Sequence, residues 1–168
     1  MSDRPIYAPW RMDYIRTLDK PDAGKCFLCE AAAATSDKER AERLVLWATP
    51  LNVVLINRYP YTNGHLLIAP RAHVADLELM PDDAAADFHR ETLRAIRLLK
   101  RAISPQGFNI GINLGRVAGA GLPGHVHQHV VPRWGGDTNF MSVVGEVRVV
   151  PQAMSQLHGE LMRFVADV

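Results

Sequence analysis

The 168-residue chain has no apolar run that approaches the roughly 18–20 residues needed to cross a bilayer, and it has almost no excess of charge. Its formal net charge is +1 and its lysines and arginines are scattered. This pattern argues against a groove for long nucleic acid but leaves a small anionic ligand possible. Residues 1–15 also lack the apolar segment of a signal peptide. We therefore expect a cytoplasmic protein that has neither a membrane nor a nucleic acid as its partner.

Cysteine is equally scarce, because the only two cysteines are Cys26 and Cys29 in the segment CFLC. In a reducing compartment such a pair is a redox couple, half of a metal site or a coincidence. The turn-like residues 19–25 weaken the redox interpretation, since a thioredoxin-like pair follows a strand. A complete zinc site needs four ligands, and histidines are the candidates for the other two.

The length fits one domain with a core of its own. Residues 1–25 contain three prolines among several aromatic residues, a composition that favours an extended arm packed on the rest of the molecule. We find neither internal repeats nor an interdomain linker. The sequence therefore predicts a single domain over residues 1–168, with residues 1–25 as an N-terminal arm.

Several runs of β-forming residues, separated by turn residues, predict a β-sheet. The β-rich runs are residues 43–49, 53–57, 65–70, 108–115 and the segment that starts at His125, with a further run at 142–150. Most connections between them are too short for parallel crossovers, so neighbouring strands should be antiparallel.

One long helix is predicted over residues 81–103, where it carries the single crossover. Its apolar stripe comprises Phe88, Leu93, Ile96, Leu99 and Ile103, and Asp82 or Asp83 is expected to cap it. A short helix or loop is expected at 30–42, and a C-terminal helix is expected to begin at Pro151. The fold class is thus α+β, with a mainly antiparallel five-stranded sheet, one long helix and a C-terminal helix.

Three histidines occupy alternate positions, at 125, 127 and 129. On a strand all three imidazoles emerge on one face, and a row of unpartnered imidazoles would be costly without a function. A neutral imidazole serves as nucleophile, proton carrier or metal ligand. The preceding glycine-rich loop 115–124 can aim backbone N–H groups at a phosphate, which favours a nucleophile at phosphorus over a bare metal-bound water.

The run His125 to Val131 resembles the motif of the histidine triad (HIT) superfamily of nucleotidyl transferases and nucleotide hydrolases. Residues 57–73 resemble the strand-turn-strand element of that family. Residues 130–141, with APWR and CFLC, most resemble the branch of diadenosine tetraphosphate phosphorylases and related hydrolases. The resemblance implies a HIT-like fold and cleavage of a dinucleoside polyphosphate through a nucleotidyl-histidine, with phosphate weakly favoured over water as acceptor.

The resemblance also assigns roles to individual residues. His127 would attack the α-phosphorus, His129 would hydrogen-bond within the site, and His65 would approach them from the neighbouring strand. Asn57 matches the residue that holds the ribose hydroxyls, and Asn113 matches an amide near the phosphate.

The glycine-rich loop departs from the family pattern, because it offers no serine hydroxyl ahead of the triad. Backbone N–H groups of Gly121, Leu122 and Gly124 can still bind phosphate. Beyond the triad, Arg133 can neutralise polyphosphate and Trp134 can stack on a base.

For the metal, the resemblance implies a structural zinc ion held by Cys26, Cys29, His73 and His125, and it also implies a homodimer.

Four alternatives to the main interpretation stay open. They are hydrolysis of adenosine phosphoramidates, hydrolysis of aminoacyl adenylates, a non-catalytic nucleotide-binding regulatory module and a catalytic metal within the triad.

Overall fold

The computed structural model describes residues 26–137 and 152–168. The predicted N-terminal arm and the β-rich run at 142–150 lie outside the described residues. The helices are α2 (Phe27–Ala33), α3 (Asp37–Glu42), α4 (Asp82–Ile103) and α6 (Met154–Met162), the 3-10 helices are η1 (Leu77–Leu79) and η2 (Val165–Asp167), and the strands are β1 (Val45–Ala48), β2 (Asn52–Ile56), β3 (Leu66–Pro70), β4 (Gly107–Ile112) and β5 (Gln128–Arg133). None of the helices in these ranges is both long and apolar enough to span a membrane.

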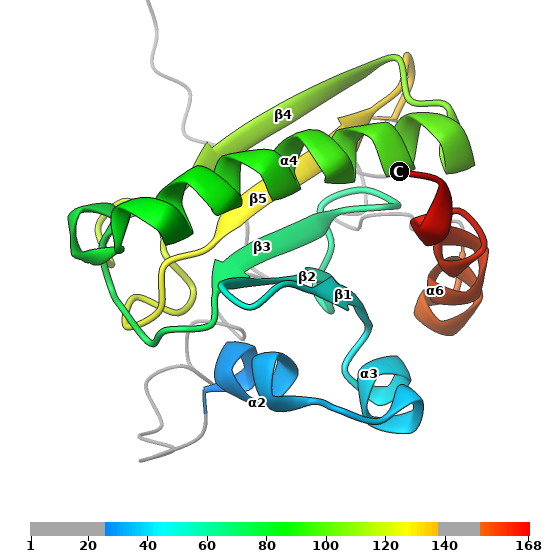
Figure 1. The fold of residues 1–168 in the computed structure, drawn as a ribbon. Helices are drawn as coiled ribbons and strands as arrows, with labels where there is room; N and C mark the ends of the chain where they lie inside the picture. The colour runs from blue at the N-terminus through cyan, green and yellow to red at the C-terminus, as the bar shows by residue number, and fades with distance from the viewer. Residues whose placement is uncertain (1–25, 138–151) are drawn as a thin grey trace, which may run out of the picture.

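The five strands form one sheet in the order β1-β2-β3-β5-β4, and every neighbouring pair is antiparallel. Because β3 and β4 both run antiparallel to the strand between them, they run parallel to each other. Helix α4 connects these two strands and lies across the sheet (Figure 1). The predicted fold class and the single crossover carried by the long helix are therefore confirmed.

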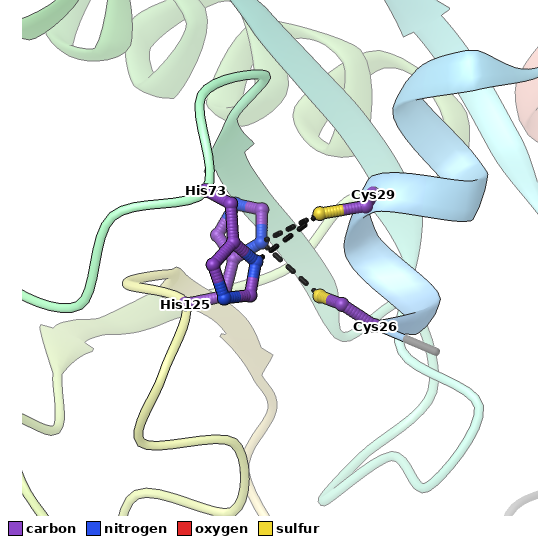
Figure 2. Close-up of side chains that lie close together, drawn as sticks. All are labelled: Cys26, Cys29, His73 and His125. Atoms are coloured by element: carbon purple, nitrogen blue, oxygen red, sulfur yellow. Dashed lines mark hydrogen bonds between the residues drawn. The ribbon is translucent and has the colours of Figure 1, made fainter. Parts of the chain in front are cut away.

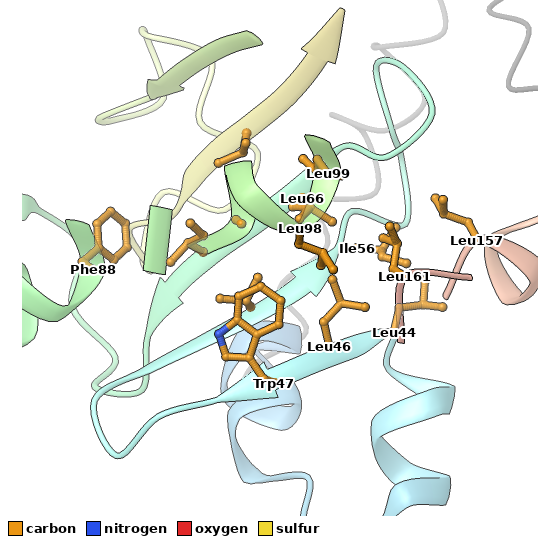
Figure 3. Packing of buried hydrophobic residues seen from close by; sticks show 14 of the residues in the cluster. Leu44, Leu46, Trp47, Ile56, Leu66, Phe88, Leu98, Leu99, Leu157 and Leu161 are labelled. Carbon is orange, nitrogen blue, oxygen red and sulfur yellow. The ribbon is translucent and has the colours of Figure 1, made fainter. Parts of the chain in front are cut away.

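The alternation of side chains divides the core between the two faces of the sheet. Val54, Ile56 and Leu66 join the larger cluster with α4 and α6, which Figure 3 shows around Leu98 and Leu161. Strand residues at the intervening positions pack beneath α2, against Leu28, Ala31 and Ala32. The sheet thus has a large covered face under α4 and a smaller covered area under α2, and the second face carries the site described below.

Helix α4 begins and ends where the sequence predicts, but its buried stripe differs. Leu93 is 43% exposed, whereas the charged residues Asp87 and Glu91 are buried. Pro81, and not an aspartate, is the N-cap residue. The stripe was misjudged because the buried carboxylates have partners far away in sequence, which helical periodicity cannot reveal.

The helical segment at 30–42 divides into α2 and α3. Ser36 begins α3 with a capping box, in which its side chain accepts the Glu39 N–H and the Glu39 carboxylate accepts the Ser36 N–H. At the other end of the chain, α6 begins at Met154 with Ala153 as its N-cap residue.

The carboxylate of Asp87 joins α4 to the turn between β1 and β2. It accepts hydrogen bonds from the Thr49 hydroxyl at 2.6 Å, the Asn52 amide at 2.8 Å and the Arg90 guanidinium at 3.2 Å. Burial disfavours ionisation of Asp87, but these donors outweigh it, so the pKa of Asp87 lies below its ordinary value. The ionised form therefore stabilises the folded state.

We expect Asp87→Asn to lower the free energy of unfolding by about 2 kcal/mol near neutral pH, because it weakens charge-assisted hydrogen bonds to buried donors. A carboxylate whose pKa is depressed by folding stabilises the protein above its unfolded pKa, and this contribution is lost as the pH falls through the folded pKa. The difference between wild type and variant should therefore shrink below about pH 4. Urea unfolding at pH 7 and pH 3 measures it, with the exposed Asp82→Asn as control. A difference of the same size at both pH values would contradict the prediction.

Candidate active site and metal site

The triad segment leads into β5, but it is not all strand. His125 and His127 precede the first residue of β5, Gln128, and only His129 lies within the strand. Val126 N–H donates to the Val74 carbonyl at 2.7 Å, which anchors the lead-in segment away from β3. The predicted alternation survives this correction, because Val126 and Val130 pack in the α4-side cluster while Cys26 and Cys29 lie against His125.

His65 is delivered to the site by a glycine that no larger residue could replace without strain. Gly64 has a φ of +77°, and a Cβ atom built there would lie 2.5 Å from Ile103 Cδ1. Only glycine combines this left-handed conformation with so close an approach of the long helix. Gly64 therefore sets the position from which His65 enters the sheet.

The side chain of His127 is only 6% exposed, and its ring orientation is fixed by one hydrogen bond. A carbonyl can only accept, so His127 donates its Nδ1–H to the His125 carbonyl at 2.8 Å. Within the described residues no hydrogen bond to its Nε2 is found, and in a neutral ring that nitrogen carries the lone pair. Burial lowers the pKa of His127, although the bond to His125 opposes this shift. A neutral imidazole with an available Nε2 lone pair is the form that can attack an electrophile.

His65 and His129 form a second pair beside His127. The Nε2 of His65 lies 3.0 Å from the Nδ1 of His129, and the rings of His127 and His129 are 5.1 Å apart. Tyr61 contributes its ring, 4.8 Å from that of His65 and 5.8 Å from that of His129. Sequence reasoning missed Tyr61, and the available signal was its place four residues before His65 in a turn.

The four residues predicted to hold zinc converge on one point. Figure 2 shows Cys26 and Cys29 projecting from the start of α2 toward His73 and His125. The Nδ1 of His125 lies 3.2 Å from Cys26 Sγ and 3.5 Å from Cys29 Sγ, and the Nδ1 of His73 lies 3.2 Å from Cys29 Sγ. All four potential ligand atoms lie within 4.8 Å of one another.

This donor set fits a tetrahedral zinc ion. Zinc–sulfur and zinc–nitrogen bonds of ordinary length would place neighbouring ligand atoms about 3.3–3.8 Å apart, close to the measured separations. His125 donates its Nε2–H to the Pro70 carbonyl at 2.8 Å, which leaves its Nδ1 lone pair directed at the thiols. Burial, and then the neighbouring Cys26, raise the pKa of the Cys29 thiol to about 11. A bound dication would lower this pKa again, because it favours the thiolate. Four protein ligands would fill the coordination shell, so the metal would supply rigidity and no reactive water.

The triad is therefore divided between two neighbouring sites. His125 faces the cysteines, whereas His129 contacts His65 and Tyr61 and has the ring of His127 beside it. This division does not favour the alternative in which one catalytic metal binds all three histidines. His125 links the two sites, because its carbonyl accepts a hydrogen bond from the Nδ1–H of the His127 ring.

The predicted substrate-binding residues have partners of their own within the protein. Asn57 contacts Tyr59 and His65, and the Asn113 amide donates to the Gly119 carbonyl at 3.5 Å. Leu122 is half-buried against the α2-side cluster, within the loop that also holds Gly121 and Gly124.

Arg133 pairs with Asp137 through two nitrogens, at 2.5 and 2.8 Å, and with Asn109 at 2.6 Å. The Trp134 N–H donates to the same Asp137 carboxylate. The residues thus hold one another at the far end of β5. Their contacts with substrate stay predictions.

The structure thus combines a histidine triad that leads into an antiparallel sheet with a further histidine, His65, from the neighbouring segment of the chain. The chain belongs to the HIT family: the HIT domain model matches residues 38–136. It is 37% identical over 151 residues to an AP-4-A phosphorylase of Mycobacterium tuberculosis, a match that covers 89% of this chain and 77% of that protein.

Two further similarities agree with this membership. The adenosine 5'-monophosphoramidase hnt1 of Schizosaccharomyces pombe is 31% identical over 85 residues, which are 51% of this chain and 60% of that protein. A Zn-bound histidine triad family protein from Mycobacterium smegmatis superposes with a TM-score of 0.66 at 25% identity, covering 85% of this chain and 94% of the other.

Proposed function

We propose that this protein cleaves dinucleoside polyphosphates of the diadenosine tetraphosphate type through a covalent nucleotidyl-His127 intermediate. The observation that carries the proposal is the buried imidazole of His127, whose Nδ1–H is engaged by the His125 carbonyl so that the Nε2 lone pair is left for attack. The similarity to an AP-4-A phosphorylase over most of the chain supports the same substrate class.

In the first step the Nε2 of His127 would form a bond to the α-phosphorus while the anhydride oxygen bond breaks, releasing one nucleotide. In the second step an oxygen of phosphate or water would displace the imidazole, and the P–N bond breaks. Dividing one displacement into two in this way is the usual advantage of a covalent nucleophile. The His125 carbonyl would stabilise the ring while it carries positive charge in the intermediate.

The acceptor distinguishes a phosphorylase from a hydrolase, and we favour phosphate on the similarity to the AP-4-A phosphorylase. Quenching with an alkaline denaturant during turnover, which preserves an acid-labile P–N bond, followed by intact-mass measurement should reveal a protein heavier by one adenylyl group. With diadenosine tetraphosphate, transfer to phosphate yields ADP and ATP, whereas transfer to water yields AMP and ATP. A turnover mixture in which no adenylylated protein accumulates under any quench time, although product forms, would reject the covalent route.

A second candidate is hydrolysis of adenosine phosphoramidates or aminoacyl adenylates by the same histidine. The observation that favours it is the similarity to the monophosphoramidase hnt1. Competition between an adenosine phosphoramidate and diadenosine tetraphosphate, compared as kcat/KM, separates the candidates. A module that binds nucleotide without turning over either compound would indicate the regulatory alternative.

We also infer that the Cys₂His₂ set holds a structural zinc ion. The convergence of four ligand atoms and the zinc in the similar M. smegmatis protein support this assignment. The residues on which it depends are Cys26, Cys29, His73 and His125. The ion would tie α2 to the segment that presents His127. The cytoplasmic location of the protein stays a prediction.

For the oligomeric state we propose a homodimer formed through β4. Among the strands in residues 26–137 and 152–168, β4 is the last in the sheet order, and it exposes Asn109, Ile110 and Gly111. An exposed strand edge with an apolar side chain is suited to pairing with a second copy. Ile110 is 44% exposed, and so is available for such a contact.

Ile110→Glu is expected to convert a dimer into a monomer, because two copies would bring like charges together at a desolvated edge. Size-exclusion chromatography with light scattering measures the mass. Val117→Glu, at a fully exposed valine in the neighbouring loop, is the matched control and should leave the dimer intact. A monomeric wild-type protein would contradict the proposal directly.

A further inference from the structure

The side chain of Asn57 is held by a turn that fixes which of its two ends faces His65. Its Oδ1 accepts the N–H of Tyr59 at 3.0 Å, an Asx turn, so this end of the amide is the oxygen. The other end, Nδ2, lies 3.3 Å from the Nδ1 of His65. An amide nitrogen can only donate, and so Asn57 presents a proton donor to His65.

A second donor reaches the same nitrogen. The backbone N–H of Tyr61 points at the Nδ1 of His65 at 3.0 Å. Since His65 Nδ1 receives hydrogen bonds from two groups that cannot accept, it carries a lone pair and not a proton. The proton of the neutral ring is then on Nε2. His65 is fully buried, so water is not positioned to replace either donor.

This assignment passes from His65 to His129. The Nε2–H of His65 donates to the Nδ1 of His129 at 3.0 Å, which makes that nitrogen an acceptor. The proton of a neutral His129 is therefore on Nε2. The ring of Tyr61 lies close to both imidazoles, with an interplanar angle of 26° to His129, and restricts their rotation.

We propose that Asn57 is a positioning residue which, together with the Tyr61 backbone N–H, fixes the proton of His65 on Nε2 and thereby keeps the proton of His129 on Nε2. His129 then presents an N–H donor beside His127, where it can stabilise negative charge on a phosphate oxygen. The catalytic consequence rests on the proposed function. The proton positions do not, and they can be measured without substrate.

The direct test is two-dimensional NMR of the histidine ring nitrogens in the full-length ¹⁵N-labelled protein without nucleotide. In wild type we expect unprotonated Nδ1 and protonated Nε2 in both His65 and His129. Asn57→Asp replaces the donor by a carboxylate that accepts, so it should move the His65 proton to Nδ1 and reverse the direction of the bond to His129. A wild-type His65 that is protonated on Nδ1, or an Asn57→Asp protein with unchanged tautomers, would overturn the proposal.

Kinetics of the same variants separate positioning from substrate binding. With the wrong tautomer, Asn57→Asp should lose about 100-fold in kcat with KM within about twofold. Asn57→Ala should lose about fivefold in kcat, since Tyr61 still donates to His65. If Asn57 instead serves only to bind ribose, Asn57→Ala raises KM and leaves kcat and the tautomers unchanged.

Arg58→Ala is the matched control, because Arg58 lies next in the chain and its guanidinium bonds only the Glu42 carbonyl among the contacts described. It should preserve both the spectrum and the kinetic constants. If the wild-type protein turns over no dinucleoside polyphosphate, the proposed function fails, whereas the NMR comparison still decides the proton positions. A spectrum that matches expectation with a purely KM effect would uphold the tautomers and reject their role in turnover.

Discussion

Replacing His127 with alanine is expected to lower kcat/KM for diadenosine tetraphosphate by about 10⁵-fold and to abolish the adenylylated protein. Loss of a covalent nucleophile that acts as a unit with its neighbours typically has effects of this size. Binding should survive, since the loop N–H groups and the sheet are untouched. Initial-rate assays measure kcat/KM, and calorimetric titration with diadenosine tetraphosphate measures the affinity of the variant for the substrate.

Two controls distinguish loss of the nucleophile from loss of the site. His89→Ala removes an exposed histidine on α4 and should leave turnover unchanged. His127→Gly opens space in which added imidazole could take up the nucleotidyl group, so partial rescue by imidazole is expected. Undiminished turnover in His127→Ala would remove the basis of the proposed mechanism.

Local patterns predicted most of the fold. The long helix, the strands of the first three β-rich runs and the antiparallel sheet follow from periodicity and short connections. The face of α4 was only partly predictable, because Asp87 is buried by partners at Thr49 and Asn52 that lie more than 30 positions away. A pattern rule that treats aspartate as exposed cannot anticipate such a partner.

Some features of the candidate site could be predicted from residue types and spacing, and others could not. Alternating histidines and the CFLC segment indicated reactive groups and ligands, and the resemblance joined them into sets. The strand boundary at Gln128 was not predictable, because His125 is drawn toward α2 and Pro70 before the ladder with β3 begins. Tyr61 and the Asx turn of Asn57 were missed for a related reason: their importance lies in backbone N–H groups, and any residue type except proline supplies one.

Cys29→Ser is expected to reduce bound zinc from one ion per chain to none and to lower the free energy of unfolding. At a free zinc concentration about 1,000 times the Kd, binding to the folded state adds about 4 kcal/mol to the free energy of unfolding. The variant would lack this contribution. Metal analysis by mass spectrometry and urea unfolding with and without chelator measure the two effects. Glu30→Ala, at the next position of α2, changes only an exposed ion pair at 4.0 Å and is the matched control.

The same variant should also lose about 10–100-fold in kcat while KM changes little, because the effect of the metal on catalysis would be transmitted through His125. Zinc on the Nδ1 of His125, with Pro70 on its Nε2, would hold the peptide whose carbonyl orients the ring of His127. Without the ion the ring of His127 would sample other orientations, and the rate would fall without loss of the nucleophile. Adenylylated protein should still form, only more slowly. If mild chelation instead abolishes turnover at once while the stability to urea is unchanged, the metal acts in the reaction itself, and a closed four-ligand site is the wrong description.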